Sequence, residues 1–212
     1  ETGVGVMAME EGLDTGPVLM ERNLSIGLLD NHHTLAERLS ALTADLMVEA
    51  MPLIESAGHG SEPERRARLK LIDQADRPGE ASYARMLSKQ DHQIDWSASA
   101  LTIHRKVMAL YPNAVTIWND KRLKILHCEP LIERLREELP AEIHPLIGRW
   151  PTGGHPPGIV LGTEKGLGIV VSTSGCPILV RAAQLEGKGR SQSDSLLQQL
   201  NAQPQQQFGT FT

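Results

Sequence analysis

The sequence has few aromatic residues, few cysteines and no long hydrophobic run. Only 3% of its 212 residues are aromatic, so we do not expect a wide aromatic surface for stacking, and the core must be built mainly from aliphatic side chains. No apolar run approaches the ~18 residues that a membrane-spanning helix needs. Cys128 and Cys176 lack CxxC spacing and the density of a disulfide scaffold. They are therefore predicted to be free thiols in a reducing compartment.

Metal-ligand patterns are also missing. The eight histidines include no His-x-x-x-His pair and no Cys/His cluster, so no metal site is expected. The hydrophobic content of 40% is ordinary for a chain that folds into one large domain or two small ones.

The charge is distributed unevenly along the chain. Residues 1–91 contain 9 Lys and Arg against 16 Asp and Glu, whereas residues 92–212 contain 12 against 10. The first half is therefore acidic and the second mildly basic, so a polyanionic partner is expected to contact the second half. A solvated charge distribution without any partner explains the same numbers equally well.

The first part of the chain contains a sharply bent acidic loop. Alternating apolar residues at 4–8 and a second apolar run at 18–20 predict two strands. Between them, Asp14 stands in the sequence Gly-Leu-Asp-Thr-Gly-Pro, at the apex of a loop beside two strand ends. Strand ends are a common location for chemistry. An aspartate between glycines is, however, most often a turn former.

A long helix and a linker are predicted next. Thr34 and Glu37 match a capping box, and apolar spacing continues the helix over residues 35–56, with a kink or break expected at Pro52. From residue 59 the apolar period disappears and charged residues accumulate with Gly and Pro. We interpret residues 59–91 as a linker between domains.

The second half is predicted to be mostly β. A helix begins at Ser99 and stops at Tyr111-Pro112, and the Asn119-Asp120 pair predicts a tight hairpin turn. Residues 129–157 form an irregular excursion, and three short β-branched runs follow. These features indicate a small barrel over residues 92–202, whereas residues 203–212 are expected to be a disordered tail.

Four motifs occur in the order and approximate spacing typical of one enzyme family. They are Glu1-Thr2-Gly3-Val4, Glu11 to Gly16, Leu87-Ser88-Lys89 with Ile94-Asp95-Trp96-Ser97, and Gln184 to Lys188. On these motifs the chain resembles the folate-dependent formyltransferases over about residues 1–200. The resemblance implies that residues 1–58 are the C-terminal remnant of an α/β, Rossmann-like catalytic domain. An OB-like small barrel with flanking helices, which helps to hold tRNA, would follow the linker.

The resemblance also implies a reaction. The formyl group of 10-formyltetrahydrofolate, a co-substrate, would move to the amino group of methionine on initiator tRNA, in a cytoplasmic, monomeric enzyme without a metal or a membrane partner. Asp14 matches the family's catalytic aspartate, and Glu11, Gly12 and Leu13 would contact the folate. The Asn-x-His motif that completes the family's site should lie upstream. The match at Asn31 follows Asp14, so Asn31 is interpreted as a loop or cap residue, and this chain alone is not expected to catalyse.

The tRNA-binding candidates are basic residues of the barrel, which could contact phosphates without reading sequence. They are Lys121, Arg122, Lys124, Arg181, Lys188 and Arg190. A solvated surface is the alternative for each of them. Two other functions stay open: a relative that formylates sugar nucleotides, and a stand-alone RNA-binding barrel with a vestigial first part.

Overall fold

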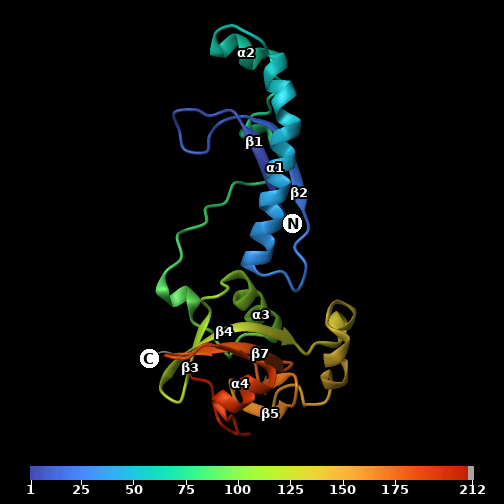
Figure 1. Cartoon of the computed structure of the whole chain (residues 1–212), viewed down its shortest axis with the longest axis vertical. Helices are drawn as coiled ribbons and strands as arrows, with labels where there is room; N and C mark the ends of the chain where they lie inside the picture. The colour runs from blue at the N-terminus through green and yellow to red at the C-terminus, as the bar shows by residue number, and fades with distance from the viewer. Residues whose placement is uncertain (210–212) are drawn as a thin grey trace. The chain divides into compact units, whose positions relative to one another are not determined.

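The computed structural model describes residues 1–209, which form two compact units (Figure 1). The first unit contains residues 1–27 and 33–85, and the second contains residues 28–32 and the chain from Met86 onward. The segment Leu28–His32 therefore packs with the second unit, although its neighbours in sequence on both sides belong to the first.

The first unit is built on a strand pair and a long helix. Strands β1 (Thr2–Met7) and β2 (Val18–Leu24) are antiparallel and enclose the Asp14 loop, which confirms the predicted strand, loop and strand. Helix α1 (His32–Ser56) follows. Its buried side chains, Leu46 and Ala50, are four residues apart and so lie on one face of the helix.

The start predicted for α1 was wrong, and so was one of the two alternatives predicted at Pro52, a break in the helix. The helix begins at His32, so Thr34 is its third residue and cannot be the N-cap; Asn31, in the predicted cap position, immediately precedes the helix. The helix is also not split at Pro52 and continues to Ser56. Gly58 follows with φ of +66°, a left-handed conformation that commonly terminates helices.

The predicted linker was too long, because residues 59–85, about four-fifths of it, fold with the first unit. Helix α2 (Glu62–Arg68) begins after Ser61, whose backbone N–H and hydroxyl both donate to the Glu64 carboxylate, at 2.8 and 2.9 Å. Arg66 forms an ion pair of 2.9 Å with Glu10 in the Asp14 loop. Because polar contacts hold this helix, its sequence has no apolar periodicity, and the helix was not predicted.

The second unit contains a six-stranded antiparallel sheet and two helices. The strand order is β3-β4-β7-β6-β5, and β8 pairs with β7. Asn119 and Asp120 connect β3 and β4 with φ of 46° and 61°, as predicted for the hairpin. The strands are β3 (Val115–Trp118), β4 (Lys121–Pro130), β5 (Val160–Glu164), β6 (Gly168–Val171), β7 (Ile178–Leu185) and β8 (Arg190–Gln192).

The two faces of this sheet are covered differently. The main core lies between the sheet and helices α3 (Ala100–Ala109) and α4 (Ser193–Leu200). A helix was predicted to begin at Ser99, and Ser99 caps α3 by accepting a hydrogen bond of 3.2 Å from the Thr102 amide. A second cluster covers Val170 and Leu179 with apolar residues of the excursion, including its 3-10 turns Glu133–Glu138 and Ala141–Leu146. The excursion is therefore part of the packed fold.

The predicted disordered tail was wrong for the described residues. Phe208 is 1% exposed, and its ring centroid lies 5.3 Å from that of Trp96 and 4.6 Å from that of Trp118. Gly209 bridges Ile117 in β3, and Gln207 bridges Ile159 just before β5. The segment therefore links the two edge strands of the sheet; residues 210–212 lie outside the described part.

Candidate functional site

The backbone of the Asp14 loop is held by one backbone hydrogen bond across its ends and by two hydrogen bonds from a side chain. The Ala8 amide donates to the Pro17 carbonyl at 2.9 Å, and the side-chain amide of Gln74 donates to the carbonyls of Asp14 and Gly16, at 2.7 and 2.8 Å. Asp14 has φ of 56° and an exposed side chain. The carboxylate is thus presented to solvent from a fixed backbone, as required for a group that acts on a ligand.

Gly16 makes this bend possible. A Cβ atom at this position would lie 1.7 Å from the Ala8 carbonyl oxygen, which no side chain tolerates. The glycine is therefore required by the close approach of two backbone segments.

The loop separates two shallow depressions. Asp14 lines one of about 410 Å³, together with Asn23, Gln74 and Arg77. Glu11 and Gly12 line the other, of about 630 Å³. Leu13 is 95% exposed. The predicted catalytic residue therefore faces a different depression from Glu11 and Gly12, two of the three predicted folate-binding residues.

Three of the basic candidates lie on the solvent side of the second unit's sheet. Lys124 pairs with Gln184 and Gln184 pairs with Arg190, so Lys124, Gln184 and Arg190 form one row across β4, β7 and β8. Arg122 lies two residues before Lys124 and shares its face, opposite to the buried Leu123.

This row adjoins a pocket with further polar groups. Arg122 lines a depression of about 380 Å³ with Lys89, His92, Gln93 and Asn113. Lys124 donates to the Asn113 amide oxygen at 3.2 Å, and Arg190 donates to the Tyr111 hydroxyl at 3.1 Å. We call Lys89, Arg122, Lys124 and Arg190 the basic face.

The other basic candidates are placed differently. Lys188 is exposed in the turn between β7 and β8. Lys121 is exposed at the hairpin and, because side chains alternate along a strand, lies on the opposite face of β4 from Arg122 and Lys124.

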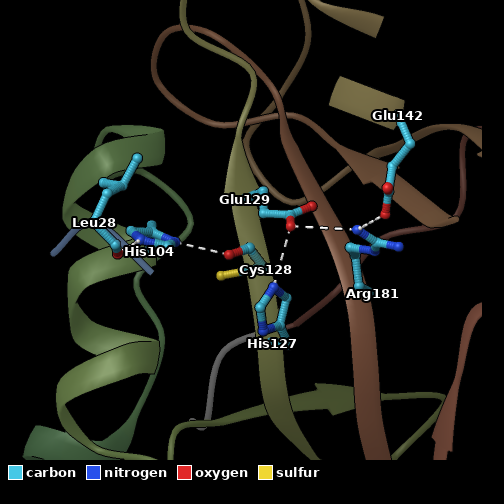
Figure 2. Close-up of polar contacts among 7 residues, drawn as sticks. All are labelled: Leu28, His104, His127, Cys128, Glu129, Glu142 and Arg181. Carbon is cyan, nitrogen blue, oxygen red and sulfur yellow. Dashed lines mark hydrogen bonds and ion pairs between the residues drawn. The ribbon is translucent and has the colours of Figure 1, made fainter. Parts of the chain in front are cut away.

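Arg181 forms ion pairs with two carboxylates, those of Glu129 and Glu142 (Figure 2). Its Nη1 lies 2.8 Å from Glu142 Oε1 and 3.4 Å from Glu129 Oε1, which also accepts from His127 Nε2 at 3.2 Å. Burial alone would lower the pKa of the Arg181 guanidinium, but the hydrogen bond that it donates to Glu142 and the charge of Glu129 outweigh burial and raise the pKa. Glu129 is 1% exposed, and its Oε2 has no hydrogen-bond partner among residues 1–209. The Arg181 charge is therefore balanced inside the protein.

Sequence reasoning missed several residues that surround the candidates. Lys89 belongs to a quoted motif, but no role was assigned to it, and the positions of Asn113 and Tyr111 beside the basic face had no local signal. Gln74 and Arg77 reach the Asp14 loop from about 60 residues further along the chain. Within the described part of the chain, no group of three His, Cys, Asp or Glu side chains could hold a metal ion, and no helix is long and apolar enough to span a membrane.

Comparison with known proteins identifies the class. Residues 86–201, which include the whole six-stranded sheet and the basic face, match the family described as "Formyl transferase, C-terminal domain". The chain therefore belongs to the formyltransferases. Among curated proteins it is 85% identical over 212 residues to the methionyl-tRNA formyltransferase of Synechococcus sp. (strain CC9311), and 53% identical over 208 residues to that of Prochlorococcus marinus (strain MIT 9313). These matches cover 100% and 98% of the chain, and 62% and 61% of the relatives. The chain thus spans about three-fifths of their length.

Solved structures share the fold at low sequence identity. Crystal structures of HypX from Aquifex aeolicus align with a TM-score of 0.60 at 17% identity for one variant, and of 0.59 at 15% identity for the complex with tetrahydrofolic acid. They cover 93% and 99% of this chain, and 30% and 34% of HypX. At this identity the likeness concerns the fold alone.

Proposed function

We propose that this chain is part of an enzyme that transfers the formyl group of 10-formyltetrahydrofolate to the amino group of methionyl initiator tRNA. The observation that carries the proposal is the 85% identity to a methionyl-tRNA formyltransferase over all 212 residues, including the Asp14 loop and the basic face. No feature of the described residues favours a sugar nucleotide as the acceptor.

In this reaction the amine attacks the formyl carbonyl carbon, and negative charge develops on the carbonyl oxygen. The bond between that carbon and the folate nitrogen then breaks, so tetrahydrofolate leaves with the bonding electrons and takes up a proton, while the amine loses one. The resemblance supplies an asparagine and a histidine from the remainder of the enzyme as donors to that oxygen. Asp14 would orient the imidazole and relay the proton that the amine loses. The exposed Asp14 carboxylate, on a loop held by hydrogen bonds, is suited to contacting the histidine contributed by the remainder of the enzyme. Glu11, Gly12 and Leu13 would contact the folate.

The basic face would hold the tRNA through its phosphates. Lys89 and Arg122 line one shallow pocket with the amides of Asn113 and Gln93. Lys124 donates to Asn113, and Arg190 lies in the same row across the strands as Lys124. Lys188 is exposed beside Arg190 and joins the same proposal. Lys121 remains a peripheral candidate. We leave Arg181 out, because Glu129 and Glu142 already balance its charge.

The finer fold assignment is part of the proposal. The strand pair and helix of the first unit fit the end of a Rossmann-like catalytic domain. The second unit fits an OB-like barrel, because Gln207 and Gly209 link its edge strands. A monomeric, cytoplasmic enzyme without a metal fits the translational role.

The catalytic part is tested with Asp14→Asn in the complete enzyme. Asparagine keeps the left-handed backbone of Asp14 but cannot accept the proton. We expect formylation of methionyl-tRNA to fall by about 100-fold or more. The matched control is Asp120→Asn, since Asp120 is also an exposed aspartate with positive φ, at 61°. Formylation near the normal rate in the Asp14→Asn enzyme would disprove the role of Asp14.

The RNA part is tested with the 212-residue chain and initiator tRNA at increasing salt. Each phosphate contact contributes roughly 0.7–0.9 to the slope of log affinity against log salt. Arg122→Gln, Lys124→Gln and Arg190→Gln should each reduce the slope by about one such contact. Lys165→Gln, in the exposed turn between β5 and β6, should leave it unchanged. No binding at low salt, or equal effects of all four changes, would refute the interface.

A further inference from the structure

Both ring nitrogens of one buried histidine point at backbone carbonyl oxygens. His104, in α3, is 0% exposed. Its Nδ1 lies 2.7 Å from the carbonyl oxygen of Cys128 in β4, and its Nε2 lies 2.7 Å from the carbonyl oxygen of Leu28 (Figure 2). A carbonyl oxygen can only accept a hydrogen bond, so each contact requires an N–H on the ring.

Only the imidazolium form satisfies both contacts. Neutral imidazole has one N–H, so in either neutral tautomer of His104 a bare nitrogen would face a carbonyl lone pair at 2.7 Å. Because the ring is fully buried, water cannot relieve that repulsion while both contacts persist. A distance of 2.7 Å agrees with hydrogen bonds in which the donor is charged.

The Leu28 contact attaches a segment that enters the second unit from outside it. The segment Leu28–His32 belongs to the second unit, whereas residues 27 and 33 are assigned to the first. Its attachment has an apolar part and a polar part: the Leu28 side chain packs against the second hydrophobic cluster, and the Leu28 carbonyl meets His104.

We propose that His104 is a proton-dependent clamp. Its imidazolium ties the Leu28 carbonyl to the Cys128 carbonyl of β4, and loss of the proton from Nε2 releases Leu28. The Leu28 side should open first, because that contact is only partly buried, whereas the contact with Cys128 is fully buried and keeps the Nδ1 proton. The clamp therefore tightens as pH falls and loosens as pH rises.

Charged and titratable groups stand on each element around His104. On α3, Arg105 is exposed and the Lys106 ammonium donates to the Gln93 carbonyl. On β4, burial raises the pKa of the Cys128 thiol and keeps it neutral, and Glu129 interacts with His127 and Arg181. The segment itself contains Asp30 and His32. His32 is an exposed histidine of the same segment, so the experiment includes a His32→Gln control.

Nuclear magnetic resonance can observe the two ends of the clamp individually. Labelling leucine with both carbonyl ¹³C and amide ¹⁵N gives signals from Leu-Leu pairs alone, and the sequence has two, Leu28-Leu29 and Leu196-Leu197. The Leu196 carbonyl is the internal control. Carbonyl-labelled cysteine with ¹⁵N glutamate reports Cys128 alone, because Cys176 precedes a proline. Ring ¹⁵N signals report which His104 nitrogens carry protons.

The pH is raised across the range in which imidazoles titrate, about 5 to 8, and beyond it while the chain stays folded. We expect both His104 nitrogens to be protonated at the low end, and Nε2 alone to lose its proton as pH rises. The Leu28 carbonyl signal should shift with the same midpoint, and the Leu196 signal should not move. His104→Gln should abolish the shift at Leu28, whereas His32→Gln should preserve it.

Several outcomes would overturn the clamp. One is a ring nitrogen that is bare at every pH while Leu28 stays in place. Another is a Leu28 signal that does not move when the ring loses its proton, or that still titrates in His104→Gln. A ring that keeps both protons until the chain unfolds would also exclude the proton dependence. If His104→Gln does not fold, the unsubstituted chain still tests the clamp, because the pH dependence of the His104 ring ¹⁵N signals can be compared with that of the Leu28 carbonyl signal.

Discussion

Replacing Phe208 by alanine should remove a large part of the second unit's stability. Phe208 is 1% exposed and contacts two tryptophan rings, at centroid distances of 4.6 and 5.3 Å. Buried Phe→Ala changes cost about 3–5 kcal/mol, and each aromatic pair contributes about 0.5–1.5 kcal/mol beyond its buried area. We therefore expect a loss of about 4 kcal/mol, a large share of the stability of a typical domain, which is about 5–15 kcal/mol.

Urea unfolding followed by tryptophan fluorescence measures this loss, because all three tryptophans belong to the second unit. With a slope of about 2 kcal/mol per M, the midpoint should fall by about 2 M. Met86→Ala is the control, since Met86 is a large apolar residue that is 90% exposed and should change stability by less than about 0.5 kcal/mol. If Phe208→Ala costs less than about 1 kcal/mol, the segment does not pack as described.

Three further predictions follow from the same structure. Gly16→Ala should destabilise the Asp14 loop by about 1–3 kcal/mol and expose the Ala8 amide to hydrogen exchange, whereas Gly175→Ala, which has open space around its Cβ, should not. Arg181→Met should cost about 3–5 kcal/mol in urea unfolding because it leaves the buried Glu129 carboxylate poorly compensated, and adding Glu129→Gln should restore part of this; additive losses would mean that the two residues are not coupled. A small maleimide should label Cys176 but not Cys128 near neutral pH in the folded chain, because burial covers the Cys128 thiol and raises its pKa; equal labelling rates would contradict this.

The parts of the fold that the sequence predicted depend on local chemistry. Asn119 and Asp120 adopt positive φ more readily than most residues, and Ser99 caps the helix that follows it directly, so both signals lie within a few residues of the structure they specify. The Asp14 loop was predicted for the same reason, because Gly16 and Pro17 bend the chain locally.

The parts that were missed depend on partners distant in sequence. Phe208 is stabilised by Trp118 and Trp96, which lie 90 and 112 residues earlier in the sequence. Because these partners are distant, the polar residues around Phe208 suggested disorder. Helix α2 is held by ion pairs and capping, which leave no apolar period. Arg181 was counted as a phosphate ligand because its charge is visible in the sequence, but its two carboxylate partners are 52 and 39 residues away.

The link between the edge strands also bears on how the chain folds during synthesis. Ile117 pairs with Gly209, so this part of the sheet cannot form until some 90 further residues have left the ribosome. Until then the core around Trp96 and Trp118 lacks Phe208 and exposes apolar surface, the condition in which newly made chains depend on chaperones.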